Sequence, residues 1–379
     1  MPNTNNMLEI KEVVTKKQQK EFLNFPLKLY KNNPYFVPPL YGDEKKIFNK
    51  DYLYLDQAEA IYFNAYLDGK IVGRISGIIQ KVSNQKRNEK RVRFTRFDSI
   101  DNQEVANQLF NAVEDWAKQK GMDTIVGPLG FSDLEREGLL IEGFDQLSTF
   151  EEQYNYDYYQ KLIENYGFEK EVDWVERKLY LPEKIDERLD RFSTLMMKRY
   201  KLKFGTAKNT KDFIKKYADK FFDIIDETYD GIYGSVPFTP ATRKLMIQNF
   251  NLIIDLNHVA VIVDENDRVV CFGICFPSLA KAVQKSQGHL TPLALIRLLK
   301  AIKKPKVLDL GLIGVLPEYA MKGISTAIVN EIMKMLLKGD IEYAETNLNL
   351  ETNHNVINLW NYFKTVQHKR RRSFVKKIL

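Results

Sequence analysis

The chain has 379 residues, of which 44% are hydrophobic and 28% are charged. This composition excludes a disordered or fibrous chain, and the length is enough for two globular domains of ordinary size. The formal net charge of +7 favours an anionic ligand, such as a phosphorylated cofactor or a nucleic acid, without locating a site for it.

Cysteine usage and hydropathy indicate the compartment. Cys271 and Cys275 lie in one apolar run, which predicts core thiols and no disulfide framework. The first residues lack the apolar stretch of a signal peptide, and no apolar run reaches the roughly 18 residues of a spanning helix. We therefore expect a cytoplasmic protein without a membrane span. The histidines have no metal-ligand spacing, so no metal site is predicted (His258, His289, His354 and His368).

The first half of the chain predicts a sheet with intervening helices. Asp68 and Gly69 separate two strand patterns, residues 61–67 and 70–80, which is typical of a tight hairpin. Residues 102–120 have the apolar spacing of a helix and are followed by a glycine. The other expected elements are strands at residues 7–14, 92–97, 124–126 and 174–181, and helices at 16–31 and 159–166.

Residues 127–145 form the least regular part of this half. They mix glycines, carboxylates and bulky apolar residues without a clear period. Long irregular segments inside a compact domain are often functional. The alternative is a buried connecting element whose Glu135, Glu137 and Glu142 only pair with surface lysines, and both interpretations stay open at this point.

The second half repeats the order of elements seen in the first. Residues 265–267 separate two strand patterns as a second hairpin. Further helices are expected at residues 185–200, 211–232, 242–250, 278–285, 292–303 and 355–363, and further strands at 201–206, 307–316, 341–348 and 373–378. The shared order indicates an ancient duplication, with one domain at residues 1–182 and the other at 183–379.

Residues 307–330, VLDLGLIGVLPEYAMKGISTAIVN, are the most informative stretch. An apolar strand pattern stops at Pro317, a short polar loop follows, and Gly323 opens a segment with helical spacing. A helix that starts after a strand presents free N–H groups and the positive end of its dipole, which suits a phosphate. The alternative interpretation is an ordinary helix start beside a strand.

The order of these residues resembles the acyl-CoA-binding segment of the GCN5-related N-acetyltransferases (GNAT). In that family Val-x-Pro is followed by Arg/Gln-x-x-Gly-x-Gly/Ala. Val315, Pro317 and Gly323 match the pattern, and Ser325 takes the second small position, whereas Ala320 stands where Arg or Gln is expected. The match is therefore partial, and it occurs only in the second half.

Most of the chain resembles a poorly characterised group of bacterial proteins with two GNAT-type domains in tandem, the YghO-like group. The similarity rests on residues 127–145 and 158–174 and on the order of residues 276–292, 310–325 and 344–360, and residues 127–145 are the most specific of these segments. The resemblance implies an α/β (α+β) fold of two tandem GNAT-like domains. Each would have a mixed, mostly antiparallel central sheet flanked by helices.

The resemblance also implies that the second half uses acetyl-CoA or another acyl-CoA as co-substrate to acylate a small-molecule amine or other acceptor. An exposed strand edge would hold the pantetheine amides through backbone groups (Leu312, Ile313, Gly314 and Val315). The loop and helix start would hold the pyrophosphate (Met321, Lys322, Gly323, Ile324, Ser325 and Thr326).

Acyl transfer to an amine needs a base for the amine and profits from an acid for the thiolate. Asp309 and Glu345 are the candidate bases, and the alternative for both is an ordinary solvated or salt-bridged strand residue. Trp360 stands where the family carries its acidic tyrosine. Tyr362 lies two positions further on, about 200° round a helix, and is the remaining candidate acid. The substrate cleft is expected to include Tyr229 and Tyr233.

Two other functions stay open. Ala320, Met321 and Trp360 favour a non-catalytic protein with a degenerate cofactor site. The basic net charge permits a transferase that uses an aminoacyl-tRNA, and nucleic acid is a partner that we do not favour. For the basic run at residues 369–372 we favour a solvated turn before a last strand, and the alternative is a site that binds phosphates or nucleic acid. A monomer or a homodimer is expected.

Overall fold

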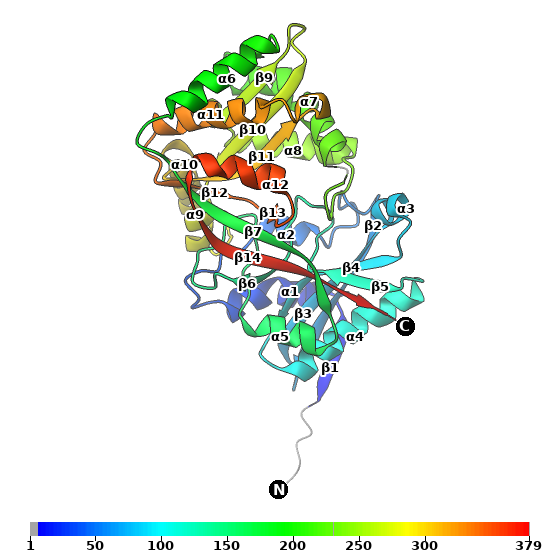
Figure 1. Cartoon of the computed structure of the whole chain (residues 1–379). Coiled ribbons are helices and arrows are strands. Elements are labelled where there is room, and N and C mark those ends of the chain that lie inside the picture. Colours follow the sequence, from blue (N-terminus) through cyan, green and yellow to red (C-terminus); the bar gives the residue numbers. More distant parts are fainter. Residues whose placement is uncertain (1–6, 230, 379) are drawn as a thin grey trace. The chain divides into compact units, whose positions relative to one another are not determined.

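The computed structural model describes residues 7–229 and 231–378, and the chain forms two compact units (Figure 1). Unit 1 comprises Met1–Trp174, Ala280–Ile296 and Lys369–Leu379, and unit 2 comprises Val175–Leu279 and Arg297–His368. These units follow spatial contacts, whereas the domains at residues 1–182 and 183–379 describe the repeat in the sequence. That division stays a prediction.

The sheet of unit 1 has the strand order β1-β2-β3-β4-β5-β14, with β6 also paired to β14. Strands β4 and β5 are parallel, whereas the pairs β1–β2, β2–β3, β3–β4, β5–β14 and β6–β14 are antiparallel, so the sheet is mixed and mostly antiparallel. Its strands are β1 (Leu8–Glu12), β2 (Ala58–Leu67), β3 (Lys70–Gln80), β4 (Arg91–Ser99), β5 (Thr124–Gly127), β6 (Leu139–Glu142) and the latter part of β14 (Lys364–Lys377).

Several local predictions for unit 1 are confirmed. Asp68 and Gly69 have left-handed φ angles of 51° and 76°, as a tight turn between β2 and β3 requires.

The helices of unit 1 were predicted only in part. The side chain of Asn102 caps the start of the predicted helix α4, whereas no sequence pattern predicted the short helices α2 and α3. The helices are α1 (Lys16–Leu29), α2 (Tyr41–Lys46), α3 (Lys81–Arg87), α4 (Gln103–Gln119), α5 (Tyr158–Asn165) and α9 (Ala280–Lys285).

The sheet of unit 2 has the strand order β7-β12-β11-β10-β9-β8, with β13 also paired to β7. Strands β11 and β12 are parallel, whereas the pairs β7–β12, β8–β9, β9–β10 and β10–β11 are antiparallel. Its strands are the latter part of β7 (Glu169–Tyr180), β8 (Lys203–Phe204), β9 (Val259–Val263), β10 (Val269–Pro277), β11 (Val307–Val315), β12 (Tyr343–Thr346) and β13 (Asn349–Leu350). The α-helices are α6 (Glu187–Arg199), α7 (Thr210–Thr228), α8 (Pro240–Ile253), α11 (Ile324–Leu337) and α12 (His354–Ile357).

Further elements complete the chain. Among residues 7–229 and 231–378, the short 3-10 helices are η1 (Leu256–His258), η2 (Pro317–Tyr319) and η3 (Asn358–Tyr362). Helix α10 (Pro292–Lys303) contributes residues to both units. Among the described residues, none of the helices combines the length and apolar character that crossing a membrane requires. Cys271 and Cys275 are buried free thiols in β10, so the predicted core role of both cysteines is confirmed.

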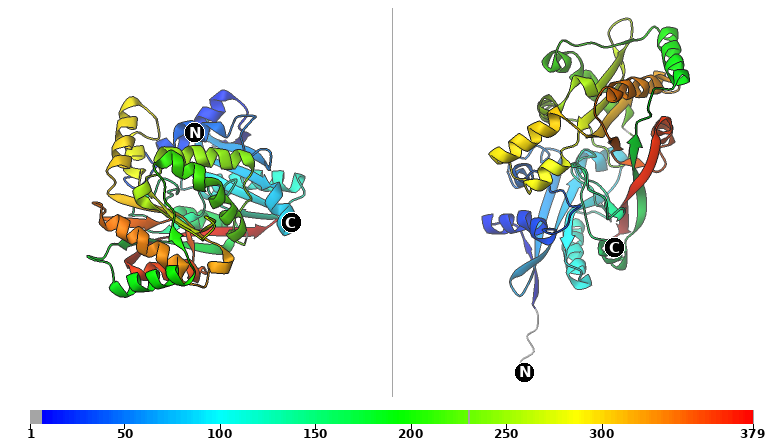
Figure 2. Two further views of the ribbon diagram at one scale, coloured as in Figure 1. Left: turned by 90° about the horizontal axis from the view of Figure 1, so that it is seen from above. Right: turned by 90° about the vertical axis from the view of Figure 1, so that its left-hand side faces the viewer.

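Different helices cover the two faces of the sheet in unit 2 (Figure 2). A side chain at Gly273 on β10 would meet Ile328 and Ile332 of α11. The preceding residue, Phe272, points to the opposite face, where its ring stacks on Phe221 of α7 with 4.3 Å between the ring centroids. The strands that carry the predicted site are therefore held rigidly between two helix layers.

The final strands of the two sequence halves are exchanged between the units. Residues 374–377 of β14, from the second half, pair with β5 in unit 1. Residues 178–179 of β7, from the first half, pair with β12 in unit 2. An apolar pattern identifies a strand but not its neighbour, so this exchange could not be predicted from the sequence.

The basic run at residues 369–372 lies inside β14, so the prediction of a solvated turn is wrong. Lys369 and Arg371 are 1% and 0% exposed. Arg370 and Arg372 point to the opposite side because side chains alternate along a strand. Both contact the carboxylate of Asp173, through Nη1 of Arg370 at 3.2 Å and Nε of Arg372 at 2.8 Å. These arginines are thus engaged in the structure of unit 1.

We expect Asp173→Asn to lower the free energy of unfolding by about 2 kcal/mol, because the hydrogen bonds lost involve charged groups. Burial raises the pKa of Asp173, but hydrogen bonds from Arg372 and Lys170 outweigh it and hold the pKa below its ordinary value. The contribution is therefore present above the unfolded-state pKa of about 3.9 and is lost as the pH falls through the folded-state pKa.

Urea unfolding near neutral pH and at acid pH would measure this effect. The difference between the native protein and the variant should shrink at acid pH. Asp101→Asn, at an exposed position of unit 1, is the control and should change neither value. A difference that stays constant as the pH falls would contradict the assignment.

Candidate functional site

Strand β12 pairs along its whole length with the beginning of β11. Their parallel register ends at Leu310 and Thr346. Beyond that point β12 stops, whereas β11 continues along β10 as far as Val315. Residues 312–315, the predicted pantetheine edge, therefore extend past the end of the neighbouring strand.

A β-bulge marks the point where the two strands part. On β10, adjacent residues oppose Leu310 and Leu312, so Gly311 is the extra residue of the bulge. A Cβ atom at Gly311 would lie 2.2 Å from the ring of Phe276. Glycine is thus required here by close packing, and the bulge redirects the outer edge of β11.

The backbone of this edge points away from β10 at alternate residues. Leu316 donates its N–H to the carbonyl of Val270 at 2.9 Å. Since inward and outward groups alternate along an antiparallel pair, Ile313 and Val315 face outward. Consistent with this, Tyr229 donates its hydroxyl to the Ile313 carbonyl at 3.0 Å. The structure thus brings a predicted cleft residue to the predicted pantetheine edge.

The loop after β11 leads directly to the start of α11. Gly323 caps this helix with a left-handed φ of 73°, and a Cβ atom there would lie 2.7 Å from the ring of Phe192. The cap has no side-chain hydrogen bond, and the first turn contains no acidic residue. The N–H groups of Ile324, Ser325 and Thr326 therefore lie at an uncompensated positive helix end.

Lys322 adds a positive charge next to this helix start. Its ammonium group lies 5.1 Å from the ring centroid of Tyr200 and 4.9 Å from that of Tyr319. These cation–π contacts hold the charge in place. Met321 is 89% exposed and makes the loop accessible to solvent. The loop thus keeps a cation although Ala320 occupies the position expected to hold Arg or Gln.

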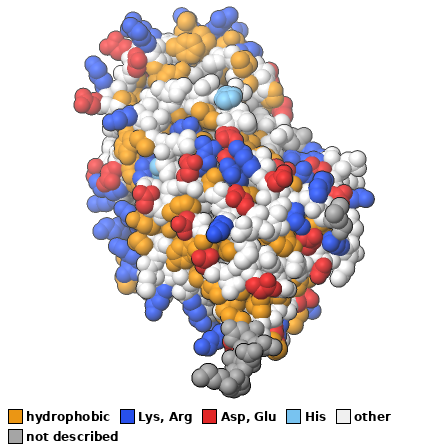
Figure 3. All heavy atoms as spheres, turned by 60° about the horizontal axis from the view of Figure 1, so that its bottom comes forward, with side chains coloured by type: hydrophobic (Ala, Val, Ile, Leu, Met, Phe, Trp, Pro, Cys, Tyr) orange, Lys and Arg blue, Asp and Glu red, His pale blue; other side chains and the backbone are white. Residues whose placement is uncertain are grey.

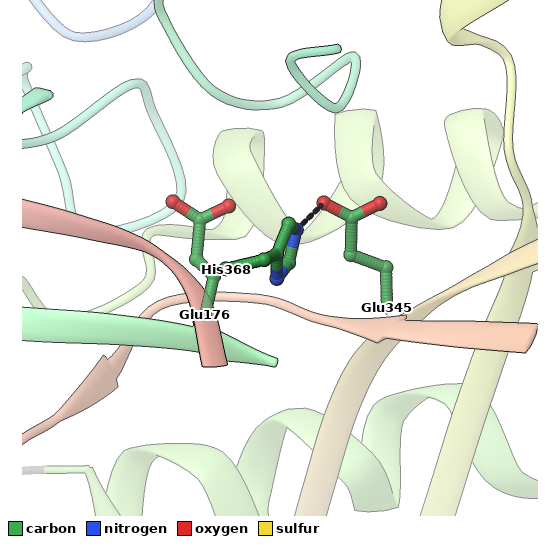
Figure 4. A group of neighbouring side chains, drawn as sticks. All are labelled: Glu176, Glu345 and His368. Carbon is green, nitrogen blue, oxygen red and sulfur yellow. Dashed lines mark hydrogen bonds and ion pairs between the residues drawn. The ribbon is translucent and has the colours of Figure 1, made fainter. Parts of the chain in front are cut away.

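One histidine and two glutamates form a buried cluster in unit 2. Nε2 of His368 lies 2.8 Å from Oε1 of Glu345, and these side chains are 5% and 7% exposed. Glu176 completes the cluster, in which one nitrogen or oxygen atom of each residue lies within 4.8 Å of the others. Figure 4 shows the His368 ring between the two carboxylates, with the side chains coming from β14, β7 and β12.

Asp309 lies beside this cluster in the strand register. Asp309 and Glu345 are direct partners on β11 and β12, so their side chains lie on one face of the sheet. The two are 4% and 5% exposed, which excludes the interpretation of solvated strand residues. Burial, and secondarily Asp309, raises the pKa of Cys275 to about 12, so this thiol is not a nucleophile at neutral pH.

Tyr362 is not brought to these carboxylates. It is 42% exposed and lines a surface pocket with Asp186 and Met333, whereas neither Asp309 nor Glu345 lines that pocket. Its role as the acid stays a prediction. The pocket lies instead along the segment that leads into α6.

Trp360, at the position of the usual tyrosine, is a buried structural residue. It is 7% exposed and donates its indole N–H to Oδ1 of Asn349 at 2.8 Å. Tyr233 is half-buried in the irregular segment that follows α7. Its role in the cleft stays a prediction.

Sequence reasoning missed Glu176 and His368. Neither belongs to a motif, and their partner Glu345 lies far from Glu176 in the sequence. One signal was present, because Glu176 interrupts the apolar part of a strand pattern, WVERKLYL, at a buried position. A carboxylate in such a place needs a partner inside the protein.

Residues 127–145 form a buried polar part of unit 1. Glu135 accepts hydrogen bonds from the N–H of Phe131 at 2.8 Å and the hydroxyl of Tyr52 at 3.1 Å. Glu137 is 4% exposed, and burial raises its pKa well above the ordinary value. The interpretation that these glutamates only pair with surface lysines is therefore wrong. Glu142 pairs with Arg370 at 3.3 Å.

Comparison with known proteins extends this description, although no family model matches the chain. The sequence is 26% identical to Protein YghO of Escherichia coli (strain K12), over 97% of this chain and 95% of that protein. It is 27% identical to a bacterial ceramide synthase of Caulobacter vibrioides (strain NA1000 / CB15N), over 79% of this chain and 78% of that protein.

Two solved structures share the fold over nearly the whole chain. A tandem GNAT protein from the clavulanic acid biosynthesis pathway has a TM-score of 0.57 at 10% identity and covers 98% of this chain and 99% of its own. A GCN5-related N-acetyltransferase from Sphaerobacter thermophilus has a TM-score of 0.51 at 11% identity, over 98% and 96%. The predicted fold and the predicted resemblance are confirmed.

Proposed function

We propose that this tandem GNAT-type protein of the YghO-like group is an acyl-CoA-dependent N-acyltransferase whose reaction takes place in unit 2. One observation carries the proposal. The free edge of β11 starts where β11 and β12 part, next to Glu345 of the buried pair with His368, and runs toward the loop that leads to the glycine-capped start of α11. This arrangement would hold a phosphorylated thioester beside a group able to accept a proton.

The start of α11 fits a pyrophosphate. The N–H groups of Ile324, Ser325 and Thr326 would donate to phosphate oxygens, and Lys322 would add a charge beside them. The absence of any acid in the first turn of this helix favours an anion there.

The open edge of β11 fits the pantetheine arm. Outward-facing Ile313 and Val315 would pair with its amides as a neighbouring strand would. Tyr229 already donates to the Ile313 carbonyl, and this oxygen has a second lone pair for a pantetheine amide. The backbone groups of Leu312 and Gly314 face β10 and would hold the edge of β11 in place from that side.

In the proposed reaction the amine nitrogen bonds to the thioester carbonyl carbon, and the carbon–sulfur bond breaks. His368, held through Nε2 by Glu345, would take the proton that the amine loses. Its other ring nitrogen, Nδ1, is buried and has no hydrogen-bond partner among residues 7–229 and 231–378. The released thiolate would take a proton from water or from an acid such as Tyr362.

We favour an amine carried by a lipid as the acceptor. The Caulobacter relative is named for the synthesis of ceramide, in which a fatty acid is amide-linked to a long-chain base. The same chemistry in this chain would join a long-chain acyl group to an amphiphilic amine. The cytoplasm stays the predicted compartment, because the thiols are free and acyl-CoA would be supplied there.

The structure gives little support to the hypothesis that nucleic acid is a partner of this protein. On the face shown in Figure 3, lysines and arginines are interspersed with aspartates and glutamates, so this face is not a uniform basic surface. The basic run at residues 369–372 is engaged within unit 1. We therefore place the reaction with a small acceptor, in a monomer or a homodimer.

A thermal-shift series with acetyl-CoA and longer acyl-CoAs tests cofactor binding. A ligand at about 100 times its Kd should stabilise the native protein by about 2.7 kcal/mol and raise the apparent Tm. Pantetheine without the nucleotide is the control and should bind more weakly. An unchanged Tm at millimolar acyl-CoA would contradict the proposal.

Release of free CoA thiol, measured with long-chain bases and with water-soluble amines, tests the transfer. Thiol release that requires the amine supports acyl transfer, and a preference for the long-chain base supports the lipid acceptor. Binding without thiol release would favour the non-catalytic alternative. Salt-sensitive binding of tRNA without acyl-CoA binding would favour the aminoacyl-tRNA alternative.

A further inference from the structure

Helix α10 carries large aliphatic side chains on its solvent side. Those with the largest exposed fractions are Leu293 at 54%, Leu295 at 48%, Ile296 at 63% and Leu299 at 56%. On the opposite side Ala294 is buried, and Leu298 and Ile302 are half-buried. A broad apolar face on a helix is normally covered by another part of the protein or by a partner. The outer face of α10 therefore lacks the cover that its composition calls for.

The positions of these aliphatic residues in the helix place their side chains next to one another. Leu295 and Leu299 are four residues apart, and Ile296 and Leu299 are three apart, so the three side chains lie together. Lys303 is four residues beyond Leu299, and Lys300 is four beyond Ile296. The aliphatic patch is thus continuous with exposed lysines toward the end of the helix.

The charged residues of α10 and of the segment directly after it are all basic. Lys300, Lys303 and Lys304 are exposed. Between Asp267 and Asp309 the sequence contains no acidic residue at all. The exposed charges on α10 itself and directly after it are therefore positive, which favours an anionic partner.

The length of α10 limits the ways in which lipid could cover it. The helix has 12 residues, which is about 18 Å at roughly 1.5 Å per residue. Crossing a bilayer takes about 20 residues. A short helix with aliphatic residues on its outer side and lysines beside them has the composition of helices that lie in the plane of a membrane surface.

We propose that α10 binds the surface of an anionic lipid bilayer. Leu295, Ile296 and Leu299 enter the boundary between head groups and acyl chains, and Lys300 and Lys303 contact the anionic head groups. A second copy of the chain is a poorer occupant, since its α10 would present the same positive charge. A nucleic acid is poorer too, since aliphatic side chains offer bases no stacking surface.

This inference goes beyond acyl transfer and does not depend on it. Membrane binding is measured without substrate or turnover. A vesicle-binding result can therefore be interpreted even if the protein does not transfer acyl groups. Conversely, a protein that transfers acyl groups but ignores vesicles would overturn only the membrane inference. If both hold, α10 would bring the enzyme to the phase in which a lipid acceptor resides.

Flotation of the full chain with vesicles tests the proposal. Phosphatidylcholine vesicles with about a third of phosphatidylglycerol should carry the protein to the top of the gradient, and salt should weaken this binding. Combined Leu295→Ser, Ile296→Ser and Leu299→Ser changes should lower the partition coefficient at least tenfold. Leu252→Ser, at a position of α8 that is 73% exposed, is the matched control and should bind normally.

A second variant reports the depth of insertion. Ile296→Trp should show blue-shifted emission with anionic vesicles and quenching by brominated acyl chains, whereas Leu252→Trp should show neither. Lys300→Gln with Lys303→Gln should reduce the preference for anionic over neutral vesicles. No flotation at low salt, or flotation that the triple serine variant retains, would overturn the proposal. Capture of a protein partner by α10 without vesicle binding would overturn it as well.

Discussion

Glu345→Gln should lower kcat for acyl transfer by about 10²–10⁴-fold and leave the affinity for acyl-CoA unchanged, because a general base contributes that much to a proton-transfer step. The carboxylate of Glu345 holds Nε2 of His368 at 2.8 Å inside unit 2. Glutamine has the same size, so packing is kept while the negative charge is lost. Steady-state kinetics with saturating acyl-CoA, together with a binding measurement, would separate the two effects.

Two further variants make this prediction specific. His368→Gln should cost about as much as Glu345→Gln, and the double variant should cost little more, because the pair acts as one unit. Glu342→Gln, at an exposed position on the same stretch of chain, should retain full activity. A Glu345→Gln variant with native kcat and native folding would exclude the pair as the base.

Ser325→Glu should weaken acyl-CoA binding at least tenfold, about 1.4 kcal/mol, while slightly stabilising the fold. A carboxylate in the first turn of α11 would interact favourably with the helix dipole, a gain of about 0.3–1 kcal/mol. The same carboxylate would repel a pyrophosphate at that helix end. The opposite signs of the two effects distinguish loss of binding from loss of folding.

Ala241→Glu is the matched control for this change. Ala241 is the second residue of α8, as Ser325 is of α11, and neither helix has an acid in its first turn. Both variants should unfold at slightly higher temperature, but only Ser325→Glu should lose acyl-CoA affinity in isothermal titration. Equal affinity in the two variants would place the pyrophosphate away from α11.

Local features of the fold could be predicted because their causes are local. The Asp68-Gly69 turn needs left-handed residues, and the strand, loop and helix of residues 307–337 are marked by Pro317 and Gly323. The partners of strands β7 and β14 could not be predicted. Their apolar patterns require burial against some sheet, and either sheet satisfies that requirement.

The residues of the candidate site could likewise be predicted only where the cause of their position is local. Asp309 and Glu345 were identified from strands adjacent to a recognisable loop, and the structure makes them register partners. His368 and Glu176 reach the site through long-range pairing, which residue spacing does not encode. Tyr362 was selected by its position along the chain, and its role as the acid stays a prediction.

The exchanged strands also set an order of events during synthesis. The sheet of unit 1 is complete only with β14, so the first half of the chain must wait for residues 364–377 before its edge at β5 is covered. Until then an unpaired strand edge is available to other chains, a state that favours misassembly. Unit 1 is therefore finished only after residues 175–368 have been made, and the two units must mature together.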